Sequence, residues 1–279
     1  MSGLTAILDD FKSDLNRVRD LLSLIKNFRT FGASTPPLEI VTETIAWKEA
    51  MVLKESAPNL RTDLPIMSGS MVLYLCGRLE YFVRQIVENI GDEIAAAVAN
   101  YEALPKGMRD ELRRRTLDIV KTPTKYGFQS TEADLALIAL AKNLDNSVAS
   151  GSGSISIASK ILSVTESNMR PSVLQDVMKR VDFSDVWREL GKQAKLKEFL
   201  QESEDKECSS AAAKRLDRLM DLRNQIAHPT AGTTFPDPDQ VIWITEYLEV
   251  LSIVLVDLCK LHLTRFTTAV RSTGIDPFA

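Results

Sequence analysis

An arginine, an asparagine and a histidine near residue 225 are the side chains of this sequence whose types and spacing best suit acid–base chemistry. Residues 222–229 are LRNQIAHP, in which Arg223 and Asn224 come shortly before His228. Arginine is a permanent planar cation whose paired N–H groups bind phosphate oxygens, and histidine exchanges protons near neutral pH. The histidine would therefore suit general acid–base catalysis, with a permanent cation close to it in the sequence.

The surrounding pattern places the histidine at the end of a helix. Apolar residues at helical spacing predict a helix over residues 210–227, with Arg223 on an otherwise apolar stripe. Pro229 disfavours helical backbone at His228, so the helix should end there, where the backbone dipole favours a protonated imidazole. A structural role is the alternative, with Arg223 paired to a buried carboxylate and His228 only capping the helix.

The rest of the chain predicts helices almost throughout. The apolar spacing indicates further helices over residues 37–56, 68–100, 131–144, 172–181, 184–190, 192–202 and 237–270. Asp237 or Asp239 can cap the last of these, with Pro238 in its first turn. Residues 150–154 predict a flexible turn. Residues 154–157, Ser-Ile-Ser-Ile, alternate as a strand would, but the stretch is too short to predict one. The predicted fold class is all-α.

The first predicted helix has apolar residues alternately four and three positions apart. They are Leu4, Leu8, Phe11, Leu15, Val18, Leu22 and Ile25. This heptad pattern fits either a coiled coil or an amphipathic helix docked on its own domain. The helix should stop near Gly32, because the prolines at 36 and 37 cannot continue it. We expect residues 1–65 to form a helical arm suited to dimerisation, and residues 66–279 a bundle with an insertion at about 105–205.

Composition and charge exclude several classes of protein. The 279 residues are 44% hydrophobic and 26% charged, with a formal net charge of -4. These values exclude a wholly disordered chain, a collagen-like repeat and a disulfide scaffold. A non-specific polyanion binder would normally be basic, so binding to nucleic acid would depend on a local basic patch. The basic residues are most concentrated over residues 106–125.

Cysteine and histidine usage predicts neither disulfides nor a metal site. The cysteines, Cys76, Cys208 and Cys259, lie in apolar or helical stretches, which is typical of buried thiols in a reducing compartment. His228 and His262 have no clustered ligands, and His262 is expected to be a satisfied core residue. No cofactor motif, signal peptide or membrane-spanning stretch is recognisable, so we expect a cytoplasmic protein without a cofactor.

The motif and its helical context resemble the HEPN superfamily. The superfamily motif is Arg, usually a polar residue, about three variable residues and then His, and Arg223, Asn224 and His228 match it in order. Residues 73–83, LYLCGRLEYFV, resemble the first core helix of the RiboL-PSP-HEPN and MAE-28990-like branches, in which a variable helical stretch separates the two halves. The resemblance covers about residues 68–270.

This resemblance implies a HEPN-type helical bundle and metal-independent RNA cleavage in a prokaryotic phage-defence or toxin–antitoxin system. The products would carry 2′,3′-cyclic phosphate and 5′-OH ends. In such a site His228 would move a proton, Arg223 would neutralise the phosphorane, and Asn224 would orient Arg223 or the phosphate. A homodimer is implied, because one motif supplies one proton-transferring residue and the reaction needs an acid and a base.

Other residues have candidate supporting roles in such an enzyme. Glu80 is expected either to pair with Arg223 or to lie on the surface. Candidates for binding the RNA backbone are Arg109, Arg113, Arg114 and Lys121. A solvated charged helix is the alternative for this run, because acidic residues interrupt it. The competing functions are a non-catalytic HEPN-like interaction module or a partner subunit of a defence complex, with an antitoxin or a sensor protein as its partner.

Overall fold

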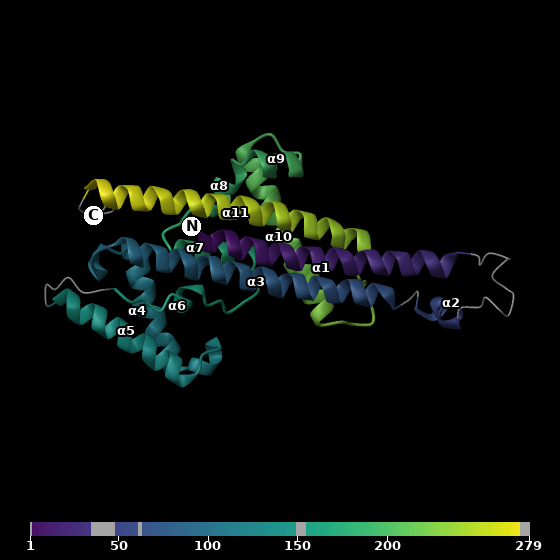
Figure 1. Ribbon diagram of the computed structural model, residues 1–279, viewed down its shortest axis with the longest axis horizontal. Coiled ribbons are helices and arrows are strands. Elements are labelled where there is room, and N and C mark those ends of the chain that lie inside the picture. Colours follow the sequence, from purple (N-terminus) through teal and green to yellow (C-terminus); the bar gives the residue numbers. More distant parts are fainter. Residues whose placement is uncertain (1, 35–47, 61–62, 149–154, 274–279) are drawn as a thin grey trace.

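Three long helices lie side by side and form an elongated body (Figure 1). The computed structural model describes residues 2–34, 48–60, 63–148 and 155–273. The long helices are α1 (Ser2–Ala33), α3 (Leu64–Ala97) and α11 (Pro238–Thr273). Each packs against the other two, so residues far apart in sequence share one core.

The remaining helices cross or cover this body. They are α2 (Lys48–Leu60), α4 (Lys106–Lys121), α5 (Ser130–Val148), α6 (Lys160–Ser163), α7 (Pro171–Lys179), α8 (Val186–Gly191), α9 (Ala194–Leu200) and α10 (Asp205–Ala227), with 3-10 turns at Tyr101–Ala103 and Pro123–Tyr126. No strand occurs in the described ranges, residues 155–157 included, so the all-α prediction is confirmed. The predicted turn at 150–154 and the first part of the predicted helix 37–56 lie outside the described residues.

Helix α1 belongs to the bundle itself. All seven residues of its heptad pattern are buried in the main hydrophobic core, and Phe11 stacks on Phe82 of α3 with ring centroids 4.6 Å apart. The docked amphipathic helix is therefore the alternative that the structure adopts. The expectation of a separate arm over residues 1–65 needs correction for α1, because its apolar face is already covered by α3 and α11.

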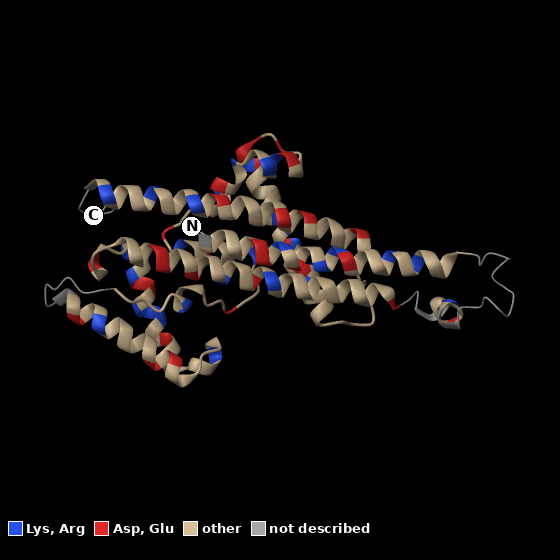
Figure 2. Cartoon of the chain, in the orientation of Figure 1, with Lys and Arg blue, Asp and Glu red and all other residues tan. Residues whose placement is uncertain are grey.

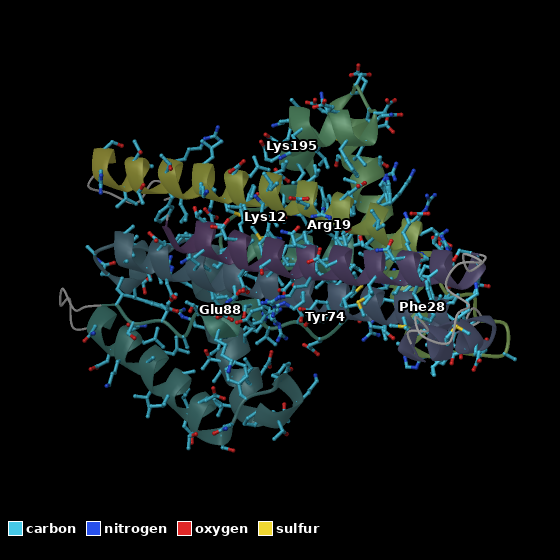
Figure 3. All side chains as sticks on the ribbon, turned by 45° about the vertical axis from the view of Figure 1, so that its right-hand side comes forward. Lys12, Arg19, Phe28, Tyr74, Glu88 and Lys195 are labelled. Atoms are coloured by element: carbon cyan, nitrogen blue, oxygen red, sulfur yellow. The ribbon has the colours of Figure 1, made fainter. Side chains whose placement is uncertain are left out.

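Polar contacts fix the position of α1 between its two neighbours. Asp14 on α1 is almost fully buried and accepts hydrogen bonds from Tyr74 (2.7 Å) and Arg78 of α3. On the other side, Arg19, which is labelled in Figure 3, pairs with Glu249 of α11 at 2.6 Å. A buried carboxylate needs such partners, because an unpaired charge would be strongly destabilising.

The expected insertion at 105–205 divides between two sides of the body. Helices α4, α5 and α6 pack below α3, where they form a small separate core that includes Ile119, Phe128 and Ile161. Helices α8 and α9 instead pack against α10 and α11 on the opposite side (Figure 1), and α7 packs against α3, α8 and α10. The residues between α6 and α7 therefore run from one part of the insertion to the other.

Helix α10 crosses the long helices, and its C-terminal end lies close to the start of α3. A Cβ on Gly69 of α3 would come within 2.6 Å of Phe235 and 3.4 Å of Ile226, so only glycine allows this approach without displacement. Helix α11 then begins with the predicted cap, since Asp237 accepts a hydrogen bond from the N–H of Asp239 at 3.0 Å. That N–H and the Arg29 guanidinium hold the pKa of Asp237 below its usual range.

The described residues contain no helix that is both long and apolar enough to cross a bilayer. The three cysteines are free and buried, as predicted.

Candidate functional site

His228 lies at the C-terminal end of α10 and is open to solvent. It is the C-cap residue with φ -126° and ψ 66°, and its backbone N–H donates to the carbonyl of Asn224 at 3.1 Å. The helix thus ends where Pro229 predicts. Within the described part of the chain, the imidazole has no hydrogen-bond or ion-pair partner. It is therefore accessible to a ligand.

Arg223 is half-buried and faces α3. Its charge lies close enough to the Cys76 thiol on α3 to lower the pKa of that thiol, although burial has the larger effect and raises this pKa to about 12. The guanidinium donates from Nη1 to Oδ1 of Asn224 at 3.2 Å. Among the described residues it has no carboxylate partner. The alternative in which Arg223 serves a buried carboxylate is therefore not what the structure shows.

Asn224 is held by a residue from a distant part of the chain. Asn168, in the segment between α6 and α7, donates from Nδ2 to Oδ1 of Asn224 at 2.6 Å. The same oxygen accepts the hydrogen bond from Arg223. Asn168, Asn224 and Arg223 therefore form a short chain of contacts that fixes one orientation of the guanidinium.

An ion-pair clamp holds this segment against α10. Arg170 lies two residues after Asn168 and pairs with Asp217 (2.5 Å) and Asp221 (2.6 Å), one turn apart on α10. These two carboxylates raise the pKa of Arg170. The clamp fixes residues 168–170 against the helix that carries the motif.

The comparison with protein families agrees with this geometry. The family model described as RiboL-PSP-HEPN matches residues 15–261, which is most of the chain. The chain belongs to the RiboL-PSP-HEPN family. Comparisons with curated proteins and with solved structures gave no match. The family match begins within α1, so the shared region starts earlier than the expected 68–270, in keeping with the burial of α1 in the bundle.

Glu80 does not support Arg223 in this HEPN-family chain. It pairs instead with Arg84, one turn further along α3, at 3.4 Å, and accepts a hydrogen bond from Thr165 at 2.6 Å. Of the two alternatives for Glu80, the pairing with Arg223 is wrong, because the carboxylate is bound by Arg84 and Thr165. Its contact with Thr165 fixes the start of the segment that carries Asn168.

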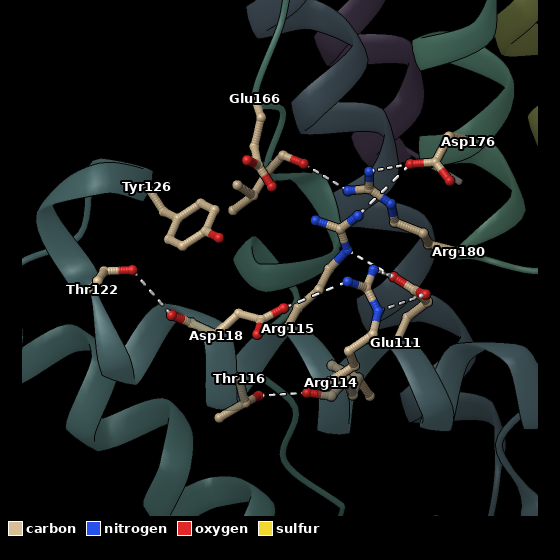
Figure 4. Close-up of polar contacts among 12 residues, drawn as sticks. Glu111, Arg114, Arg115, Thr116, Asp118, Thr122, Tyr126, Glu166, Asp176 and Arg180 are labelled. Atoms are coloured by element: carbon tan, nitrogen blue, oxygen red, sulfur yellow. Dashed lines mark hydrogen bonds and ion pairs between the residues drawn. The ribbon is translucent and has the colours of Figure 1, made fainter.

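The basic run lies on α4 and is largely neutralised. Arg109 and Arg113 pair with Glu102, and Arg114 pairs with Glu111 (2.8 Å) and Asp118 (3.5 Å). Figure 4 shows the same pattern around Arg115, which lies between carboxylates of α4 and α7. In Figure 2, acidic and basic segments lie together over α4.

The α4 residues also do not meet the motif within one chain. Helix α4 packs on α5 and α6, whereas α10 packs on α3, α8 and α9. Lys121 is exposed at the end of α4. Within a single chain, therefore, the structure does not bring Arg109, Arg113, Arg114 and Lys121 together with Arg223 and His228.

The second histidine has a structural environment. The His262 ring stacks on Phe183 with centroids 5.3 Å apart, and its Nε2 lies 3.2 Å from the carbonyl oxygen of Val181. Burial lowers the pKa of His262. His262 is therefore a partly buried residue with contacts of its own, which agrees with the expected structural role and not with a fully buried core position. In the described part of the chain, no three His, Cys, Asp or Glu side chains are grouped as metal ligands.

Asn168 is the site residue that the sequence did not indicate, and its substitution is a test. Asn168→Ala removes one hydrogen bond worth about 0.5–1.5 kcal/mol. If Arg223 acts in the transition state, we expect about a three- to tenfold lower kcat for RNA cleavage with little change in KM, measured on a fluorogenic RNA. Ser167→Ala is the matched control, because Ser167 is an exposed neighbour and should leave both constants unchanged. Unchanged kcat in Asn168→Ala would contradict the positioning role.

Proposed function

We propose that this protein is a metal-independent endoribonuclease that leaves 2′,3′-cyclic phosphate and 5′-OH ends. The observation that carries the proposal is the placement of the family motif. His228 is solvent-exposed at the end of α10, and Arg223, without a carboxylate partner among the described residues, is oriented by Asn224 and Asn168. An oriented free guanidinium close in sequence to an accessible imidazole suits phosphoryl transfer.

The proposed reaction is an in-line attack within the RNA backbone. The ribose 2′-oxygen forms a bond to the adjacent phosphorus and loses its proton to a base, and the bond from phosphorus to the 5′-oxygen breaks. The departing 5′-oxygen takes a proton from an acid. His228 supplies one of these two transfers. Arg223 stabilises the charge that develops on the phosphorane oxygens.

A homodimer would supply the second proton transfer. One chain offers one accessible imidazole at the motif, since His262 is enclosed by Phe183 and the Val181 carbonyl. In a dimer that brings two motifs to one cleft, one His228 acts as the base and the other as the acid. The heptad face of α1 is buried within its own bundle, so this dimer would use another surface.

The biological setting belongs to the proposal as well. The family membership supports a role in prokaryotic phage defence or a toxin–antitoxin system. In that setting an antitoxin or a sensor protein would restrain the nuclease in the cytoplasm until it is needed.

The products of RNA cleavage test the proposal directly. Purified protein is incubated in EDTA with total cellular RNA and a random-sequence RNA, and the new ends are mapped. We expect cleavage to persist in EDTA with cyclic-phosphate ends, because neither proton transfer needs a metal. RNA carrying 2′-O-methyl groups should stay intact, because it lacks the attacking hydroxyl. Cleavage of the methylated RNA, or loss of cleavage in EDTA, would contradict this mechanism.

A non-catalytic HEPN-like module or partner subunit is the second candidate. The observation that favours it is the free His228 ring, which no described side chain orients for proton transfer. Two results would support this candidate over the nuclease. One is saturable RNA binding without any cleavage, and the other is co-purification with a stable protein partner without any RNA cleavage.

A further inference from the structure

A groove runs along the outer face of α10, beside the first turns of α11. One part is a cavity of about 570 Å³ lined by residues that include Arg215, Arg218, Leu222 and Trp243. A second hollow of about 630 Å³ continues it toward the start of α10 and shares Arg215 and Arg218 as lining residues. We call these two connected hollows the α10 groove.

The cations of the α10 groove are free of carboxylate partners. This holds for Lys206, Lys214, Arg215 and Arg218 within the described residues. The acids nearby on α10, Asp217 and Asp221, are bound by Arg170, and Asp239 at the groove edge is bound by Lys26 at 2.7 Å. Glu202 and Glu207 also line the far end of the second hollow. The part nearest α11 therefore carries Arg215 and Arg218 against a single carboxylate, Asp239, which is already paired with Lys26, in contrast to α4.

An exposed aromatic stack lies beside these cations. Trp243 is 37% exposed, and the Arg215 guanidinium lies over its ring at 4.4 Å from the centroid. Tyr247 and Phe199 support the indole from within the protein, with centroids 6.1 and 5.8 Å away. Arginine planes and aromatic rings are the surfaces on which unpaired bases stack.

We infer that the α10 groove binds single-stranded RNA. The backbone phosphates would contact Lys214, Arg215 and Arg218, and one base would extend the stack formed by Arg215 and Trp243. Arg218 precedes His228 by ten residues on the same helix, which is about 15 Å along its axis. Ten residues end about 80° short of three whole turns, so a strand leaving the groove would pass part-way around α10 to reach the motif. The inference rests on the proposed function for its substrate class, but its test measures binding alone.

The test compares two triple variants that remove equal charge. Both are made on the His228→Ala background, so that the RNA stays intact, and affinity for a labelled single-stranded RNA is measured by fluorescence anisotropy at several salt concentrations. The groove variant is Lys214→Ala, Arg215→Ala and Arg218→Ala. The control is Lys142→Ala, Lys179→Ala and Arg265→Ala, at exposed positions on α5, α7 and α11. Because the control lowers the net charge equally, any difference reports on location.

The groove variant should bind RNA at least about tenfold more weakly, with a salt slope reduced by about 2, since each of the three lost phosphate contacts on a single strand contributes about 0.7. The control variant should change affinity by less than about twofold. Equal losses of affinity in both variants, or unchanged affinity in the groove variant, would overturn the inference. The single variant Arg218→Glu at an exposed position repeats the comparison without disturbing the Arg215 stack. Weaker binding in the groove variant with no cleavage by the wild-type protein would reject the nuclease while supporting the groove.

Discussion

Replacing His228 with alanine is expected to lower the rate of RNA cleavage by about 10²–10⁴-fold, the usual contribution of a general acid or base. The imidazole is exposed and has no protein partner within the described residues, so its removal should not change the stability of the bundle. Single-turnover cleavage of a labelled RNA measures the effect, with circular dichroism to confirm the fold. His228→Ala that is folded and fully active would reject the proposed chemistry.

Arg223 provides the second arm of this experiment. Arg223→Ala should lower the rate by about 10²–10³-fold, as expected for the loss of one group that stabilises a developing oxyanion. Arg223→Lys keeps the charge but loses the planar fork, so it should restore only part of the activity. Arg265→Ala, at an exposed position on α11, is the control for general loss of positive charge. The double variant of Arg223 and His228 should lose less than the product of the two effects, because residues acting as a unit are not additive.

The sequence predicts most helices because their apolar spacing is local and strong. The alternation of four and three residues in α1 corresponds to seven buried residues in the structure, and the predicted boundary at His228 follows from one proline. The burial of Cys76, Cys208 and Cys259 also follows from local composition. Such features depend on neighbours within one or two turns, which a single sequence contains.

The details of the candidate site depend on contacts between distant segments. Asn168 is 56 residues from Asn224, and it lies in a connection without helical periodicity. The partners of Glu80 likewise include Thr165, 85 residues away. The periodicity could not choose between a docked α1 and a coiled coil, since both bury the same apolar residues.

The basic run illustrates the same limit for electrostatics. The acids within α4 are visible in the sequence, but Glu102 and Asp176 reach its arginines only in the folded chain. The cations of the α10 groove are separated by acids in the sequence. In the folded chain Arg170 pairs with Asp217 and Asp221, so these acids do not neutralise the groove cations. A net charge of -4 therefore coexists with a local basic groove.

The burial of α1 leads to the largest expected effect on stability. Phe11 is 1% exposed and stacks on Phe82. Truncation of a buried phenylalanine costs about 3–5 kcal/mol, a large share of a typical free energy of unfolding of about 5–15 kcal/mol. Phe11→Ala should therefore lower the melting temperature by about 6–20 °C, measured by circular dichroism.

Leu24→Ala is the matched control on the same helix, because Leu24 is 63% exposed and its truncation should change stability by less than about 0.5 kcal/mol. Light scattering of both variants distinguishes the two roles of α1. A separable dimerisation arm would lose its oligomeric state in Phe11→Ala while the rest of the chain melted at an unchanged temperature. The docked helix predicts instead that Phe11→Ala lowers the melting temperature of the whole chain and leaves its oligomeric state unchanged, since α1, α3 and α11 share one core and must unfold together.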